Sequence, residues 1–193
     1  MSTGPLFVLV GGGARSGKSR HARARAESLG ARRLFVATAE REPPGGPADP
    51  ELGARIARHR AERGEAFETV EEPLALPELL DRAWARAAPD HDVVLVDCLT
   101  LWLSNLLCSG ASEEEALGRV EALRAAIGRR RSHIVVVSNE VGMGLVPETP
   151  LGRLFRDVAG IAHQRLARDA DEVHVGLLGM MLRVRPPPVV VIS

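Results

Sequence analysis

The chain has 193 residues, of which 45% are hydrophobic and 26% are charged, enough to bury a normal core as one compact α/β domain. Its 25 basic and 25 acidic residues cancel, which argues against a global basic field that would attract nucleic acid or an anionic membrane. The two cysteines do not have the spacing of a metal site, and the sequence shows no leader pattern and no apolar run of roughly 18 residues. We therefore expect a cytoplasmic protein without stable membrane insertion.

Strand and helix patterns alternate along the chain. Unbroken apolar runs, which are typical of strands covered on both faces, predict strands at 5–10, 33–38, 92–97 and 133–138. Helical patterns lie at 20–29, 51–63, 74–88, 113–128 and 150–169. The final runs, 172–177 and 180–185, meet near Gly179 and predict a C-terminal β-hairpin. The order predicts a single domain over residues 1–193, with a doubly wound, mostly parallel sheet, a mobile Pro/Gly-rich loop at 41–50 and an undetermined tail at 186–193.

A glycine-rich segment between the first strand and the first helix matches the pattern GxxxxGK[ST]. In this motif small residues let backbone N–H groups converge on phosphate oxygens, and the helix N-terminus adds its dipole. Lys18 is the only lysine in the sequence, and it falls on the lysine of the motif. The segment predicts a P-loop NTPase-type fold and a nucleotide cradle made by Gly12, Gly13, Ala14, Arg15, Ser16, Gly17, Lys18 and Ser19. Lys18 would neutralise phosphate charge and Ser19 would ligate Mg²⁺.

Asp97 ends the apolar run VVLVD, where P-loop proteins commonly hold Mg²⁺ with a carboxylate. Its alternative role is the N-cap of a helix that starts near Leu99. The motif DVAG at 157–160 resembles the DxxG of a GTPase switch, but it lies inside a predicted helix and no NKxD follows. A signalling GTPase is therefore a poor fit.

His59 lies among four arginines on the predicted helix at 51–63. Leu52, Ile56 and His59 share one face of that helix, so the histidine can be a structural residue at the boundary of the core. Alternatively, a neutral imidazole can attack phosphorus, while Arg60 and Arg63 offset the phosphate charge. The periodicity alone favours the structural role.

Nearly the whole sequence resembles the bifunctional adenosylcobinamide kinase/adenosylcobinamide-phosphate guanylyltransferase family of cobalamin nucleotide-loop assembly. The blocks that carry the resemblance are GGARSGKSRHA at 12–22, VATA at 36–39, RIARHRAER through TVEEP at 55–73, VLVDCLTLWLSNLL at 94–107 and VVSNEVGMGLVPETPLGRLFRDVAGIAHQRLA at 136–167. The last block is the most specific, because NEVGxGxVP followed by FRDxxG is not a general P-loop feature.

This resemblance implies phosphorylation of adenosylcobinamide with ATP or GTP, followed by transfer of GMP from a guanylylated His59. Mg²⁺ and a corrinoid substrate follow from the same reactions, and the family's assembly implies a homotrimer. The nucleotide contacts that it implies outside the P-loop are Ala37, Thr38, Ala39, Arg60, Ala61, Glu62, Arg63, Glu71 and Asp97, with Lys18 and His59 as catalytic residues.

Three positions depart from the family's pattern. Gly64 replaces an expected proline, Phe67 replaces an expected tryptophan but keeps an aromatic face for a base, and His163 replaces an expected asparagine. We expect His163 and His21 to face solvent, and His91, His133 and His174 to be structural. Glu140 either faces solvent or orients a water or an acceptor hydroxyl.

Two other functions remain open from the residues. One is a small-molecule P-loop kinase without guanylyltransferase activity, in which His59 is structural. The other is a nucleotide-binding regulatory protein without catalysis, which the missing switch and guanine-specificity motifs disfavour.

Overall fold

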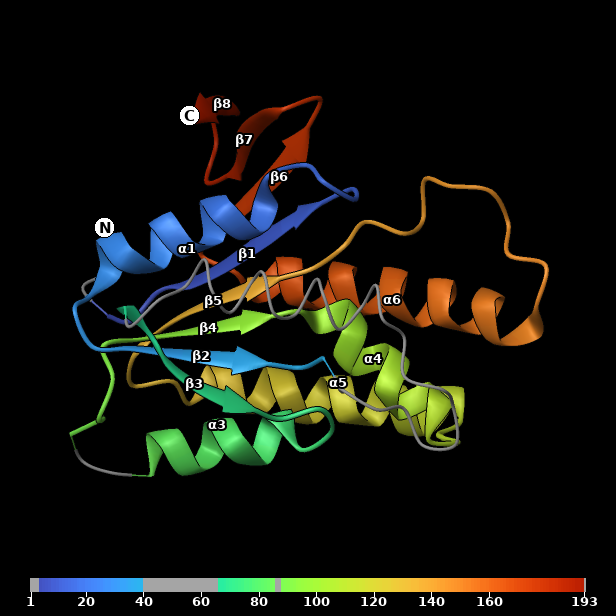
Figure 1. The fold of residues 1–193 in the computed structure, drawn as a ribbon, viewed down its shortest axis with the longest axis horizontal. Coiled ribbons are helices and arrows are strands. Elements are labelled where there is room, and N and C mark those ends of the chain that lie inside the picture. The colour runs from blue at the N-terminus through green and yellow to red at the C-terminus, as the bar shows by residue number, and fades with distance from the viewer. Residues whose placement is uncertain (1–3, 40–65, 86–87, 193) are drawn as a thin grey trace.

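A computed structural model describes residues 4–39, 66–85 and 88–192 (Figure 1). The predicted loop at 41–50 and the predicted helix at 51–63 lie outside the described residues, together with His59, Arg60, Ala61, Glu62 and Arg63.

The described strands form one eight-stranded sheet in the order β3-β2-β4-β5-β1-β6-β7-β8. The strands are β1 (Phe7–Gly12), β2 (Arg33–Ala37), β3 (Glu68–Glu71), β4 (Val93–Asp97), β5 (His133–Val137), β6 (Glu172–Leu177), β7 (Met180–Arg185) and β8 (Val190–Ile192). All pairs from β3 to β6 are parallel, and β7 and β8 extend the sheet antiparallel. The predicted fold class, including the C-terminal hairpin, is confirmed.

Helices cover both faces of the sheet, and the apolar strands follow from this arrangement (Figure 1). On one face α1 (Lys18–Leu29) packs its Ala22 and Ala26 against Val8, Val10 and other strand residues. The opposite face, which includes Phe7 and Leu9, is covered by α3 (Leu76–Trp84), α4 (Leu99–Cys108), α5 (Glu113–Gly128) and α6 (Pro150–Asp169). Alternate side chains of each central strand are therefore buried on opposite faces, so these strands are apolar throughout.

Several boundaries differ from the sequence-based expectation. The predicted helix at 74–88 is described only over Leu76–Trp84, and the strand expected at 5–10 runs over Phe7–Gly12. The sequence analysis missed β3, whose residues are mostly exposed, and β8 in the undetermined tail. Within the described part of the chain, no helix combines the length and apolar character that a membrane span requires.

The helices α5 and α6 begin at residues that cap them with their side chains. Ser112 and Glu115 form a reciprocal capping box at the start of α5. Thr149 caps α6 by accepting a hydrogen bond from Gly152 N, and Pro150 occupies the first position of that helix. The capped start of α6 also fixes the end of the long loop that follows β5.

Candidate active site

The glycine-rich segment forms a strand–loop–helix turn at the carboxyl edge of the sheet, as predicted. β1 ends at Gly12 and α1 begins at Lys18. Gly17 is the N-cap residue in a left-handed conformation (φ 86°), which glycine adopts without steric cost. Arg15 also has a positive φ of 56°, so the loop curls tightly between Gly13 and the helix. This backbone can present several N–H groups to an anion.

Lys18 lies against this loop rather than in solvent. Its side chain is buried, and Nζ donates a hydrogen bond to the carbonyl of Gly13 at 3.0 Å. The buried hydroxyl of Ser16, on the same loop, has no hydrogen-bond partner among the residues that the structure describes. A buried ammonium and an unsatisfied hydroxyl in one loop fit a bound anionic group that supplies further oxygen atoms.

Asp97 ends β4 at the same edge, where its strand is separated from β1 only by β5. Two strand spacings correspond to roughly 10 Å, a gap that a metal-bound phosphate group can bridge. Cys98, and not Asp97, occupies the N-cap of α4, and no side chain caps that helix. The alternative role of Asp97 as a helix cap is therefore wrong.

The ends of β2 and β3 place further predicted nucleotide contacts at this edge. Ala37 pairs with Asp97 on one side and with Glu71 on the other. The buried hydroxyl of Thr38 donates to the carbonyl of Cys98 at 2.7 Å and accepts from its N–H at 2.8 Å. Thr38 therefore ties the ends of β2 and β4 together, while Glu71 is exposed.

The end of β5 brings Ser138, Glu140 and His163 together. Nε2 of His163 lies 2.6 Å from the hydroxyl of Ser138, and Nδ1 lies 3.9 Å from a carboxylate oxygen of Glu140. Only 20% of the His163 side chain is exposed, and burial lowers the pKa of this imidazole below its usual value. The expectation that His163 faces solvent is wrong, because α6 turns this residue toward the sheet beside buried Ala159 and Ala162.

Comparison with known proteins identifies the family. The profile of the family described as cobinamide kinase / cobinamide phosphate guanyltransferase matches residues 8–184. The chain belongs to this family. It is 41% identical over 181 residues to the bifunctional adenosylcobalamin biosynthesis protein CobP of Pseudomonas aeruginosa, covering 93% of this chain and 98% of the relative. It is 38% identical over 192 residues to CobU of Escherichia coli, covering 93% of this chain and all of the relative.

The same two activities therefore belong to this chain, which is a bifunctional cobinamide kinase and cobinamide phosphate guanylyltransferase. Among solved structures, a KaiC-like protein from Pyrococcus horikoshii aligns with 96% of this chain and 77% of its own length. That similarity, a TM-score of 0.46 at 14% identity, is too low to inform function.

The structure changes what we expected of two aromatic side chains, His21 and Phe67. His21 does not face solvent, because its Nε2 lies 2.9 Å from Nδ1 of buried His174. Phe67 is buried among core residues, with its ring edge-on to Phe35 and under the guanidinium of Arg33. The surroundings of Phe67 therefore do not favour the expected base-stacking role, since the residue is only 6% exposed and Arg33 lies over its ring.

His21 and His174 belong to a partly buried network of polar and charged side chains that also contains Glu172 and Arg25. His174 Nε2 lies 3.2 Å from Glu172, at an angle that makes no hydrogen bond, and Arg25 binds both oxygens of Glu172 at 2.7 and 3.0 Å. Burial and the neighbouring charges of His174 and Arg25 lower the pKa of His21. The prediction that His174 is structural agrees with this burial, and the network joins α1 to β6.

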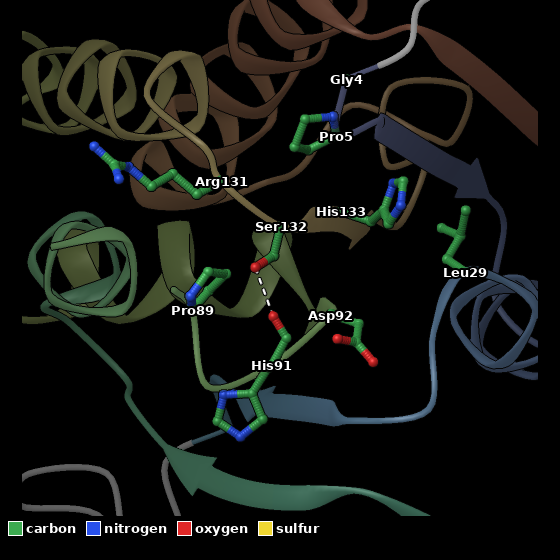
Figure 2. A pocket seen from close by; sticks show the side chains of 9 residues that line it. All are labelled: Gly4, Pro5, Leu29, Pro89, His91, Asp92, Arg131, Ser132 and His133. Atoms are coloured by element: carbon green, nitrogen blue, oxygen red, sulfur yellow. Dashed lines mark hydrogen bonds between the residues drawn. The ribbon is translucent and has the colours of Figure 1, made fainter. Parts of the chain in front are cut away.

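A pocket of about 320 Å³ lies at the opposite edge of the sheet, where the strands begin (Figure 2). Its lining includes His91, Asp92 and His133, and Ser132 donates a hydrogen bond to the carbonyl of His91. The imidazole of His133 accepts a hydrogen bond from Leu6 N, and His91 contacts Glu68 at 2.8 Å. These contacts support the structural role predicted for both histidines and separate this pocket from the P-loop edge.

Proposed function

We propose that this enzyme phosphorylates the hydroxyl of adenosylcobinamide with ATP or GTP and then transfers GMP from GTP through a guanylyl-histidine to form adenosyl-GDP-cobinamide. The observation that carries the proposal is the P-loop of a CobU-family chain, where the only lysine is buried against the loop and Asp97 ends a strand at the same edge. Residues 1–193 would act as one catalytic domain.

The kinase reaction needs the triphosphate charge to be neutralised and its γ-phosphoryl group aligned. In the proposal, backbone N–H groups from Gly12 to Ser19 hold the phosphate oxygens, and Lys18 contributes a positive charge. Mg²⁺, when bound, withdraws charge from the phosphates. The hydroxyl of Ser19 and the carboxylate of Asp97 would hold it together with nucleotide oxygens, as Mg²⁺ sites with few protein ligands do.

The guanylyl transfer is assigned to His59, which lies outside the described residues. A ring nitrogen of His59 would form a bond to the α-phosphorus of GTP as the bond to the β-phosphate oxygen breaks, and pyrophosphate would leave with the electron pair. The phosphate of cobinamide phosphate would then displace the histidine. Arg60 and Arg63 would offset charge, and Ala37, Thr38, Ala39, Ala61, Glu62 and Glu71 would surround the nucleotide.

The assembly and location are part of the same proposal. We expect a homotrimer in the cytoplasm, acting on small molecules and not on nucleic acid. Exposed apolar side chains support an assembly, because Leu145 is 96% exposed on the loop after β5 and Leu178 is 89% exposed on the turn between β6 and β7.

The deciding experiment uses GTP labelled at either the α- or the γ-phosphate. After incubation with Mg²⁺, denatured wild-type protein should retain only the α-label, in a bond stable to alkali and labile to acid. The His59→Ala variant should retain none while still binding GTP. If folded, GTP-binding wild-type protein retains no label, the guanylyl-histidine intermediate is wrong.

A further inference from the structure

Glu140 belongs to the most specific sequence block of this chain, yet neither half of the proposed function uses it. Its backbone N–H donates to the carbonyl of Gly12 at 2.9 Å, and Ser138 N donates to Val10 at 2.9 Å. The first residues after β5 are therefore held against the start of the P-loop. The carboxylate is attached to a short, fixed segment that begins beside the phosphate cradle.

The side chain of Glu140 is also held in place. One oxygen accepts the N–H of Gly142 at 2.6 Å, and a second oxygen faces Nδ1 of His163 at 3.9 Å. The side chain stays 35% exposed, so a substrate can reach it. Across the ring, Nε2 of His163 contacts the hydroxyl of Ser138, a residue that is only 1% exposed.

Phosphorylation of an alcohol leaves one requirement that the P-loop does not meet. The hydroxyl oxygen forms a bond to the γ-phosphorus while the bond from that phosphorus to the bridging oxygen breaks, and the nucleoside diphosphate leaves with the electron pair. The proton of the hydroxyl must go to a base. Lys18 carries positive charge, and Asp97 is assigned to the metal, so neither is suited to accept it.

We infer that Glu140 is the base that accepts the proton of the corrinoid hydroxyl in the kinase step, and that Ser138 and His163 position its carboxylate. The proton moves from the hydroxyl to a carboxylate oxygen of Glu140 and then to solvent. Glu71 is the other exposed carboxylate predicted at this edge, but it lies on β3, with β2, β4 and β5 between it and the P-loop strand. In this assignment the Ser138 hydroxyl donates its hydrogen bond to Nε2, which leaves the ring proton on Nδ1, on the side of Glu140.

This assignment rests on the proposed function, and its test separates the two half-reactions. Glu140→Gln keeps an oxygen for the Gly142 N–H but removes the base. We expect its kcat for phosphorylation of cobinamide to fall about 10²- to 10⁴-fold. GTP binding and GMP transfer to cobinamide phosphate supplied ready-made should stay near wild type. Glu148→Gln, an exposed carboxylate on the same loop, is the matched control and should leave both half-reactions unchanged.

Two results would overturn the assignment. One is kinase activity of Glu140→Gln within about threefold of wild type, which is too small a loss for a missing base. The other is an equal loss of both half-reactions, which would make Glu140 a structural residue of the nucleotide site. A folded wild-type enzyme with GMP transfer but no kinase activity would contradict the proposed function, and the base with it.

The positioning role of Ser138 and His163 predicts a separate effect on the kinetics. Ser138→Ala frees the His163 ring without touching Glu140, so kcat of the kinase should fall about 10-fold while KM for cobinamide and the rate of GMP transfer stay constant. An increase in KM with unchanged kcat would place this pair in substrate binding and contradict the positioning role.

Discussion

Gly12 and Gly176 lie opposite each other on β1 and β6, and a Cβ at either position would make a tight contact. A Cβ on Gly12 would lie 2.8 Å from the carbonyl oxygen of Gly176, and one on Gly176 would lie 3.0 Å from the hydroxyl of Ser16. Gly12 also has a φ of 150°, which residues with a Cβ rarely adopt. The P-loop therefore begins at a position that leaves no room for a Cβ.

Gly12→Ala should separate these strands and displace the loop. We expect a loss of about 1–3 kcal/mol in the free energy of unfolding, the range for a strained backbone, and a clear loss of GTP affinity. Urea unfolding and calorimetric titration with GTP measure the two effects. Gly118→Ala is the control, since nothing lies within 4 Å of a Cβ at this exposed helical position. The control should unfold no more easily than wild type, and an equally stable Gly12→Ala would contradict the close approach.

Lys18 offers a chemical test, because no other lysine side chain competes for an amine-selective reagent. An acyl-phosphate derivative of GTP should deliver its acyl group to Lys18, as the buried ammonium lies against the phosphate loop. Mass spectrometry should find one modified lysine peptide, lost when excess GTP is present. Modification of the N-terminal amine serves as the internal control and should not respond to GTP. Equal labelling of Lys18 with and without GTP would contradict its place in the nucleotide site.

Acid should weaken the bridge between α1 and β6. The neighbouring His174 and the bound Arg25 hold the pKa of Glu172 at about 2, below its usual value of 4.5. Because the folded pKa is depressed, the stabilisation is fully present above the unfolded pKa and is lost as the pH falls toward about 2. Glu172→Gln should lower the free energy of unfolding by about 1–3 kcal/mol at neutral pH, the range for charged hydrogen bonds that are partly buried.

Unfolding measured at several pH values tests this assignment. The difference between wild type and Glu172→Gln should shrink as the pH falls below 4.5. Glu148→Gln, an exposed carboxylate, should follow the wild-type curve throughout. A Glu172→Gln difference that stays constant down to the acid limit would show that the charge of Glu172 does not stabilise the fold.

Substitution of Phe67 tests whether its ring packs in the core or stacks on a nucleotide base. Its ring is 6% exposed and lies against Phe35, so Phe67→Ala should cost about 3–5 kcal/mol of unfolding free energy, while the folded fraction binds GTP normally. Thermal unfolding and GTP titration at low temperature measure each effect. Val189→Ala shortens a side chain on a residue that is 62% exposed and serves as the stability control. A large loss of GTP affinity with an unchanged melting temperature would restore the stacking role.

The strands that are buried on both faces of the sheet could be predicted from the sequence. The runs that became β1, β4 and β5 are apolar on both faces, so length and composition identified them without a structure. β3 was not predicted, because its sequence, ETVE, is exposed at the edge of the sheet and shows no apolar run. The P-loop was predictable because its chemistry depends on residue types at fixed spacing, in particular Lys18 after Gly17.

The contacts of the histidines were not predictable in the same way. His163 meets Ser138 only because α6 crosses the end of β5, and His21 meets His174 only because β6 pairs beside β1. Those neighbours are 25 and 153 residues apart in sequence, beyond the reach of local periodicity. The buried stripe of Val158, Ala159, Ala162 and Leu166 was the available signal, since it places His163 at the edge of the packed face of α6.

The position of β1 in the sheet has a consequence for how the chain folds. This strand carries the start of the P-loop, yet its partners pair Phe7 with Ile134 and Val8 with Glu172. During synthesis this apolar strand has no pairing partner until most of the polypeptide has left the ribosome. Such distant pairings slow folding, because a long loop must close before any contact stabilises it. A nascent chain that stops before β5 should therefore depend on chaperones and should not bind nucleotide.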